Sequence, residues 1–585
     1  MKRRHPLLTA LLTVVVGLIV APAAFAAPAT IKPADTVLKN GYVYTAEARP
    51  ATAEAMAIRA GTIVFVGSSA DAAKYVGPAT RVVDLKGRMV MPGFVDSHIH
   101  ASISVSQLYS VQLYGMTSID AYLSAVADFA AQNPNLPVVR GEGWSNTLAP
   151  GIGPLASDLD AIVSDRPVAL SSEDYHSLWV NTRALEMAGI SGQTPDPLNG
   201  VIERLPGSVS STNPYGVPSG TLRETATALV TDLLPDYSVA QYVEGLRFFQ
   251  DVVAGPLGIT AVFDPLVKVG SNAAAAYEQL ATSGAATMRV RAALALEPGG
   301  NMAKWVTAAK AERAAHTTDF FQTKAAKLFI DGVVEGHTAY LAQDYADTPG
   351  DRGTPIWQPA ELNAACAAVD KAGFQIHAHA IGDAANSEIL DSLAYARKVN
   401  GTRDWRPGIT HLQLVTPTDF KRFASLGVTA VPQPYWFLMD DYYTYLQVPY
   451  LGQPRADHEY PMKSFFDAGV LVASASDFPV TYPPDPLDGI QTGVMRWFPD
   501  WVHNPNDVLW PEERVTTQQM IQSFTLNGAK ANYLETTTGS LKVGKSADLI
   551  VLNRNIVTAT PSLIGSSKVL MTMFRGQEVF RDAQF

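Results

Sequence analysis

Two histidines separated by one residue, His98 and His100, end the segment Met91–His100, which reads MPGFVDSHIH. A β-strand alternates its side chains between two faces, so both imidazoles point to the same side if the strand runs through them. Imidazole is a ligand of zinc and its first-row neighbours. The pair therefore predicts a metal site at the end of a strand.

Four more polar residues each lie in or at the end of another apolar run: Lys327, His379, His411 and Asp477. Lys327 stands inside AAKLFIDG, where a lysine is costly to bury without a purpose. Any one of these residues alone would more often be structural. Their joint order along the chain (HxH, Lys, His, His, Asp) predicts one site gathered from the ends of several strands.

Strand-like apolar runs alternate with helical patterns through the middle of the chain, as a parallel βα fold requires. The strand-like runs are Met91–Val95, Thr287–Leu296, Ala326–Ile330, Phe374–His379, Val428–Pro432 and Val470–Ser474, and helices are expected at Pro359–Ala372 and Pro417–Leu426. Active sites of (β/α)₈ barrels lie at the C-terminal ends of the strands. The sequence therefore predicts an α/β fold, a (β/α)₈ TIM barrel over residues 92–536.

Two β-rich flanks, residues 27–91 and 537–585, surround this middle. We expect one small β-sandwich domain made from both chain ends, although two separate β appendages would give the same pattern. Residues 102–324 are more than two or three βα units need, so this region should contain a large insertion. Its Gly/Pro/Ser-rich part, residues 192–220, is expected to be a loop that covers a substrate site.

The first 26 residues have the features of a signal peptide. Basic residues at positions 2–4 precede an apolar run, Leu7–Val20, and residues 24–26 read AFA, an A-x-A cleavage site. The apolar run is short for a membrane span, which disfavours an uncleaved anchor. We expect an exported protein, periplasmic or extracellular, with no stable membrane anchor and a mature chain starting at Ala27.

Composition limits the partners and the kind of metal site. The 585 residues carry a formal net charge of −11, which offers no general attraction to nucleic acid. Cys366 is the only cysteine, so intrachain disulfides and thiolate clusters are excluded, and metal ligands must be His, Asp, Glu or a modified Lys. The expected partner is a small-molecule substrate, and a homo-oligomer stays an open alternative.

Five motifs together resemble those of the amidohydrolase superfamily: PGFVDSHIH, KLFIDG, HAIGD, THLQLV and SDFPV. Their combination is similar to its YtcJ-like branch (amidohydrolase family 3), which includes N-substituted formamide deformylases. The resemblance covers nearly all of the chain after the signal peptide. It implies one or two divalent metal ions, with zinc as the default, and gives each residue of the constellation a role. His98 and His100 bind one metal, Lys327 is an N6-carboxylysine bridging two metals, His379 and His411 bind the second, and Asp477 contacts metal and the attacking water.

Four further residues are expected to contact substrate: Trp144, His176, His337 and His377. Trp144 in GEGW and His176 in HSLWVN also resemble the YtcJ-like branch. Three of them have an alternative: Trp144 could be core, His176 a helix-start contact, and His377 a metal ligand or a support for the metal ligands. Lys327 has one too, since an unmodified lysine paired with Asp331 or Glu335 would leave a one-metal site.

The resemblance implies hydrolysis by a metal-activated water, with Asp477 as general base and then general acid and with His411 as a second catalytic residue. Base deaminases of the superfamily carry Glu three residues after the histidine that matches His379, where this chain has Gly382. Hydrolysis of an amide C–N bond is therefore favoured. An esterase or lactonase, or a non-hydrolytic isomerase or binding protein, stays as an alternative. Residues 332–339 read GVVEGHTA, where many relatives resemble GSxGSRTA, so a pocket residue has changed and no particular substrate is transferred.

Overall fold

The computed structural model describes residues 31–47, 53–502 and 504–585, so the predicted signal peptide lies outside the described residues. Its centre is an eight-stranded sheet in which all neighbouring strands are parallel. In spatial order the strands are β7 (Phe94–Asp96), β14 (Ile259–Val267), β15 (Arg289–Ala295), β16 (Phe321–Phe329), β17 (Gln375–Ala380), β18 (Gly408–His411), β19 (Thr429–Val431) and β20 (Leu471–Val472).

Backbone hydrogen bonds join the two ends of this sheet. The amide of Ser97, just after β7, donates to the carbonyl of Ser474, just after β20, at 3.2 Å. The amide of Asp477 donates to the carbonyl of His98 at 2.8 Å. These bonds bring the first and last strands together, so the sheet curls into a barrel and the segments after β7 and β20 become neighbours.

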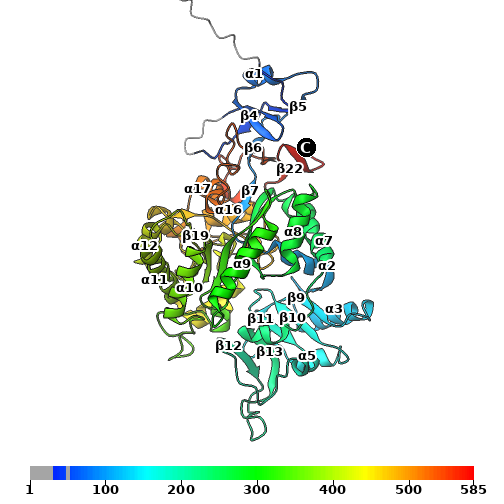
Figure 1. Cartoon of the computed structure of the whole chain (residues 1–585), viewed down its shortest axis with the longest axis vertical. Helices are drawn as coiled ribbons and strands as arrows, with labels where there is room; N and C mark the ends of the chain where they lie inside the picture. The colour runs from blue at the N-terminus through cyan, green and yellow to red at the C-terminus, as the bar shows by residue number, and fades with distance from the viewer. Residues whose placement is uncertain (1–30, 48–52, 503) are drawn as a thin grey trace, which may run out of the picture.

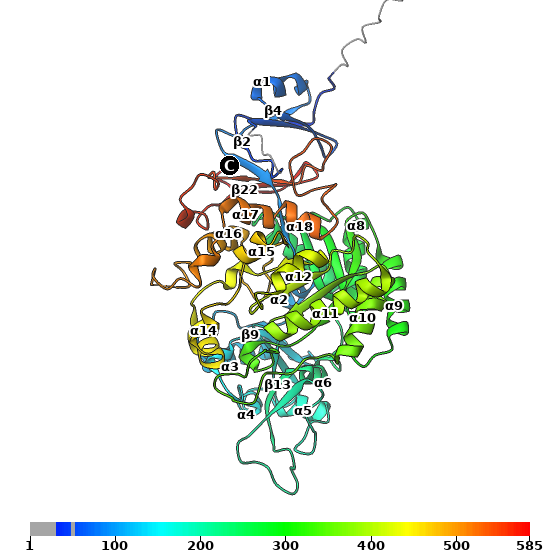
Figure 2. The same cartoon turned by 90° about the vertical axis from the view of Figure 1, so that its left-hand side faces the viewer.

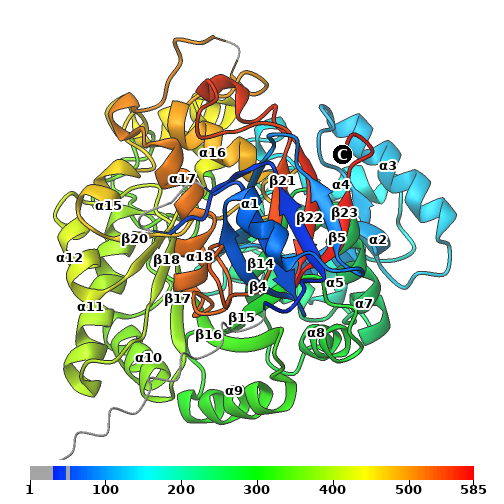
Figure 3. The ribbon, with the colours of Figure 1, turned by 90° about the horizontal axis from the view of Figure 1, so that it is seen from above.

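Helices follow the strands in the order expected for a βα barrel and cover the outside of the sheet (Figures 1 and 3). They include α8 (Asn272–Thr282), α9 (Met302–His316), α10 (Pro359–Lys371), α11 (Asp383–Asn400) and α12 (Asp419–Leu426). Their buried faces and the strands form the largest hydrophobic cluster. The predicted strand runs and the two predicted helices are confirmed, with ends that differ by a few residues.

Two further sheets lie at one end of the barrel (Figure 2), one made of N-terminal strands and one that combines strands of both chain ends. One has the order β4 (Thr62–Gly67), β3 (Ala55–Arg59), β1 (Thr36–Lys39), β5 (Arg81–Asp84). The other has the order β2 (Tyr42–Val43), β6 (Met89–Pro92), β21 (Leu549–Leu552), β22 (Val569–Phe574), β23 (Gln577–Arg581). One hydrophobic cluster contains side chains of both sheets, among them Leu38, Met56 and Val551. The two chain ends therefore share one core.

The predicted strand Met91–Val95 divides between two sheets. β6 pairs with β21 in the end domain, whereas β7 pairs with β14 in the barrel. Gly93 lies between them, and a Cβ there would come within 2.3 Å of Oγ1 of Thr260. Only a residue without a side chain lets the chain pass from one sheet to the other so close to the barrel wall.

An additional six-stranded sheet lies between β7 and β14 in the sequence. Its spatial order is β12 (Gly200–Arg204), β13 (Pro218–Glu224), β11 (Ser177–Val180), β10 (Val168–Ser172), β9 (Val139–Trp144), β8 (Val111–Gln112). We call residues 111–224 the insertion. Residues 102–324 were expected to hold barrel elements and an insertion, and the barrel elements in this range are β14, β15 and the start of β16. Residues 192–220 are largely loop, as expected, but none of them lines a cavity at the barrel mouth. They contain β12 and the start of β13, and the tip of this hairpin extends away from the barrel (Figures 1 and 2).

Among the described residues, no helix is both long enough and apolar enough to cross a membrane.

Candidate metal centre

His98 and His100 follow the end of β7 and meet Asp477, which follows β20. Nε2 of His98 and Nε2 of His100 each lie 3.2 Å from Oδ1 of Asp477. The ligand atoms of these three residues lie within 4.8 Å of one another, a spacing that suits one metal ion. β7 ends at Asp96, so the two histidines reach Asp477 from irregular backbone and not from a continuous strand.

Backbone geometry at the barrel mouth presents Asp477. Its φ is +61°, an unusual value for a residue with a side chain. The hydrogen bond from the amide of Asp477 to the carbonyl of His98 holds this backbone conformation. Asp96 supports the same junction: its buried carboxylate accepts from the amides of His98 at 3.1 Å and Ser476 at 3.1 Å. Burial raises the pKa of Asp96 to about 7. The sequence prediction gave Asp96 no role, although an Asp two residues before the first histidine of HxH was the available signal.

The atoms at the centre fit a cation. Oδ1 of Asp477 and Nε2 of His98 are buried without a hydrogen-bond partner. Burial, and then the charge of Lys327, hold the pKa of His98 well below its usual range, so the ring is neutral, the form that binds metal. A lone pair on Nε2 that faces a carboxylate oxygen at 3.2 Å is repulsive unless a cation lies between them. Neutral imidazole and carboxylate are donors that zinc accepts.

His377 lies behind His98, with its Nε2 2.7 Å from Nδ1 of His98. Burial, followed by Lys327, lowers the pKa of His377 well below the usual value. One neutral ring therefore donates to the other. Donation from Nδ1 of His98 leaves the lone pair on Nε2, which faces Asp477. His377 was expected to face substrate or to support a ligand; it supports His98 and lines neither large cavity.

Lys327 is buried on β16 and 1% exposed, and its Nζ lies 4.6 Å from the centre of the Phe329 ring. Burial lowers the pKa of its ammonium to about 7. Neither Asp331 nor Glu335 pairs with it: Asp331 accepts from three backbone amides, and Glu335 contacts Gln447. The described residues therefore do not show the alternative, in which an unmodified Lys327 forms an ion pair with Asp331 or Glu335.

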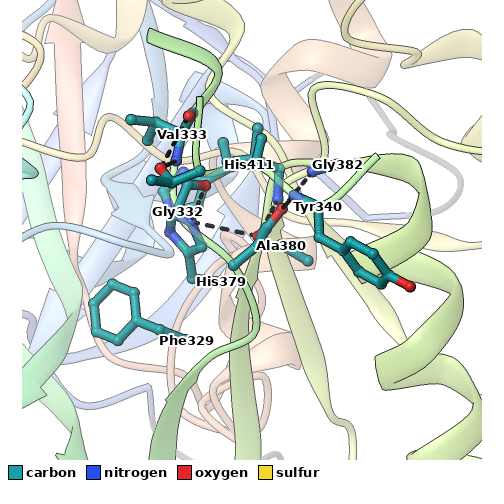
Figure 4. Close-up of polar contacts among 12 residues, drawn as sticks. Phe329, Gly332, Val333, Tyr340, His379, Ala380, Gly382 and His411 are labelled. Atoms are coloured by element: carbon teal, nitrogen blue, oxygen red, sulfur yellow. Dashed lines mark hydrogen bonds and ion pairs between the residues drawn. The ribbon is translucent and has the colours of Figure 1, made fainter. Parts of the chain in front are cut away.

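His379 and His411 stand beside the three-residue cluster with their rings 4.5 Å apart (Figure 4). Nε2 of His379 is turned to the carbonyl of Gly332 at 3.1 Å. Nδ1 of His411 lies 3.8 Å from Oδ2 of Asp477. Both histidines line the cavities around the centre, but their nitrogens are not among the ligand atoms that converge with His98 and His100.

His176 from the insertion is the one predicted substrate contact that lies at the cavities next to the centre. Its Nδ1 is 2.8 Å from Oε2 of Glu224, whose φ is +50° and whose other oxygen accepts from Thr338 at 2.6 Å. Burial lowers the pKa of His176, but the charge of Glu224 outweighs this and raises the value to about 9. The sequence prediction missed Glu224.

Two predicted substrate contacts lie elsewhere. Trp144 is fully buried in the hydrophobic core of the insertion, where its Nε1 donates to the carbonyl of Leu170 at 2.9 Å. His337 pairs with Asp347 at 2.9 Å and packs on the ring of Tyr450. Neither lines the two cavities at the metal centre, so both assignments are corrected. In the GVVEGHTA segment the residues that line the smaller of these cavities are Val333 and Glu335 instead.

Two cavities meet at the centre. The larger, about 730 Å³, is lined by His98, His100 and Lys327, and the smaller, about 370 Å³, extends over the barrel mouth. Both are lined by Asp174, His176, His379, His411, Asp477 and Val480. Cavities of this size accept small organic molecules.

Comparison with known proteins agrees with this geometry. The model of the Amidohydrolase family (Amidohydro_3) matches residues 81–580. The putative amidohydrolase YtcJ of Bacillus subtilis is 28% identical over 92% of this chain and 98% of that protein. The N-substituted formamide deformylase of Arthrobacter pascens is 25% identical over 93% and 97%.

A solved structure shares the fold. The uncharacterized metal-dependent hydrolase of Pyrococcus furiosus has a TM-score of 0.67 and 24% identity, covering 89% of this chain and all of that one. The family match spans the barrel and most of the sheet that contains β6, β21, β22 and β23, and the resemblance to the YtcJ-like branch is confirmed. This chain therefore belongs to the amidohydrolase family.

Proposed function

We propose that this protein hydrolyses the amide C–N bond of a small molecule placed where the two cavities meet. Membership of the family makes it a metal-dependent hydrolase of C–N bonds. The observation that carries the proposal is the cluster of His98, His100 and Asp477, in which Nε2 of His98 and Oδ1 of Asp477 are buried without partners. All three residues line the larger cavity, and Asp477 lines the smaller one as well.

His98, His100 and Asp477 would hold one divalent ion, with zinc as the default for these ligands. The ion would supply Lewis acidity, which lowers the pKa of water and polarises a carbonyl group. Lys327 supports a second ion: its lowered pKa leaves a large neutral fraction, the form that combines with CO₂ to give an anionic carbamate. With that carbamate, His379 and His411 would complete a second ligand group.

Asp477 acts as the proton carrier of the reaction. Its carboxylate accepts a proton from the attacking water as the new C–O bond forms, and donates it to the amine nitrogen as the C–N bond breaks. A carboxylic acid and an amine leave, so one water is consumed and no other reactant is needed. His411, whose Nδ1 lies 3.8 Å from Oδ2 of Asp477, borders the same space and, in a site with one ion, would hold the carbonyl oxygen.

The surroundings of His379 support amide over nucleobase hydrolysis. The position three residues later is Gly382, where no side chain can carry a proton. The next residue, Asp383, begins α11, and its carboxylate accepts from the amides of Ala342 and Ala384. The name of the Arthrobacter relative, an N-substituted formamide deformylase, is consistent with an amide substrate.

The test is a panel of N-substituted formamides and acetamides with matched esters and nucleobases, using zinc-loaded protein. We expect turnover of amides and a loss of about 10³-fold in kcat for Asp477→Asn, because a proton transfer is removed. Metal content per chain and native mass give the number of ions and the carbamate at Lys327. Unchanged turnover in His98→Ala would remove the proposed site.

We also propose export of the protein with cleavage after Ala26, on the basis of the sequence pattern in residues 1–26. N-terminal sequencing of the secreted or periplasmic form should begin at Ala27.

A further inference from the structure

The smaller cavity has an acidic wall built from three separate parts of the chain. Glu173 follows β10 in the insertion, Glu335 lies in a turn (Val334–Gly336) after β16, and Asp440 lies in the loop after β19. No lysine or arginine is among the described residues that line this cavity. Three carboxylates from distant segments thus line a space in which the one basic side chain with a raised pKa, His176, is already paired with Glu224.

These carboxylates keep free acceptor capacity. Oε1 of Glu173 accepts from the Tyr442 hydroxyl at 2.6 Å, and Oδ1 of Asp440 accepts from the Tyr443 amide at 3.0 Å. Glu335 has only a long contact of 3.4 Å with Nε2 of Gln447. Asp174 differs, since Asn146, Ser172 and the His176 amide donate to it, so it belongs to the local fold. An unpaired carboxylate away from bulk water is costly, and a cation offsets that cost.

Aromatic rings form much of the remaining wall. Trp436, Tyr442 and Trp501 line the same cavity, and the ring of Trp436 stacks on His411 at 5.6 Å. The face of an aromatic ring attracts a cation. Carboxylates together with aromatic faces form a site for an organic cation rather than for a hydrated metal ion, which would need more oxygen ligands.

The inner end of the cavity reaches the metal centre. Asp477, which is 6% exposed, lines its inner end, and Oδ1 of this residue has no hydrogen-bond partner. A molecule that fills the cavity therefore reaches the centre at one end and the acidic wall at the other.

We propose that the smaller cavity selects amides that carry a basic group, an ammonium or guanidinium, on the part of the molecule distant from the scissile bond. Glu335 is the main specificity residue, with Glu173 and Asp440 beside it, and Trp436 and Tyr442 contact the cation. This inference rests on the proposed function for the position of the scissile bond. Burial raises the pKa of Glu335 to about 7 and that of Asp440 to about 6, as expected for carboxylates without a cation.

The first test measures binding without turnover. Tryptophan fluorescence and calorimetry of zinc-loaded protein would compare n-butylammonium with 1-butanol, which has the same number of heavy atoms and no charge. We expect n-butylammonium to bind at least about ten-fold more tightly. Glu335→Gln should weaken its binding about ten-fold and leave 1-butanol unchanged, and Asp440→Asn should act in the same direction. Glu512→Gln is the matched control, because Glu512 is exposed and does not line the cavity.

Equal binding of the two probes, or unchanged n-butylammonium binding in Glu335→Gln with normal thermal unfolding, would overturn the inference. A second test compares kcat/KM for N-(4-aminobutyl)formamide and N-pentylformamide, where we expect a preference of at least about ten-fold for the first. If no amide is turned over but the binding result holds, the proposed reaction fails and the cation site stands. If both amides are turned over equally, the reaction stands and the cation site fails.

Discussion

Nδ1 of His98 lies 2.7 Å from Nε2 of His377, so a ring on β17 holds the orientation of the first predicted metal ligand. Both rings are buried and neutral, and the direction of this hydrogen bond decides which nitrogen of His98 is free. Hydrogen bonds of this kind to ligating histidines commonly contribute 10- to 100-fold to metal affinity.

His377→Ala should therefore weaken zinc binding about 10- to 100-fold without removing the fold. His377→Gln, which keeps an acceptor near Nδ1 of His98, should lose less. Competition with a chromophoric chelator measures the affinity, and circular dichroism checks the fold. His458→Ala is the control, because His458 is an exposed histidine that bonds the carbonyl of Pro454. Equal zinc affinity in His377→Ala and His458→Ala would show that the 2.7 Å contact has no role in metal binding.

The pair of His176 and Glu224 predicts a pH dependence of stability in metal-free protein. Because the pKa of folded His176 is raised to about 9, above its ordinary value near 6.5, the pair stabilises the fold fully below about pH 6.5. That contribution, at most about 3 kcal/mol, is lost as pH rises through 9. Glu224→Gln should flatten the fall in the unfolding midpoint between pH 7 and 9.5. An equal fall in both proteins would contradict the assignment.

A close backbone contact predicts that adding a side chain at Gly382, which precedes α11, destabilises the protein. A Cβ on Gly382 would lie 1.9 Å from the carbonyl oxygen of Tyr340, and the amide of Gly382 donates to Asp331 at 2.8 Å. Gly382→Ala should therefore destabilise the protein by about 1–3 kcal/mol and disturb His379, three residues earlier. Chemical denaturation measures this. Gly300→Ala is the matched control, since a Cβ at Gly300 meets only one atom, at 3.7 Å. A similarly small loss of stability in both variants would show that the contact at Gly382 does not constrain the fold.

The barrel and the meeting of three polar residues at its mouth could be predicted from the sequence because both depend on local patterns. Apolar runs separated by helices produce parallel strands, and polar residues at strand ends then meet at one mouth. His98, His100 and Asp477 do meet there. Which atoms face each other depends on turns after the strands, and periodicity does not describe those turns.

The missed residues illustrate this limit. Glu224 ends the last strand of the insertion, and its role comes from a positive φ and from two contacts, with His176 and Thr338, that are distant in sequence. Within GVVEGHTA, Glu335 faces the cavity and His337 faces Asp347, because a short turn with His337 at φ +54° separates them. The comparison of GVVEGHTA with GSxGSRTA predicts that a pocket residue has changed. It does not predict toward which side of the loop each side chain points.

Trp144 and Trp501 give the last prediction, since one is buried in the insertion and the other lines the smaller cavity. Trp144→Phe removes the hydrogen bond to the carbonyl of Leu170 and should destabilise the insertion by about 1–3 kcal/mol while KM changes little. Trp501→Phe should instead change KM with little effect on stability, because Trp501 is 37% exposed. Hydrogen exchange of the insertion strands and steady-state kinetics separate the two effects. A KM change in Trp144→Phe with unaltered exchange would return Trp144 to the substrate contacts.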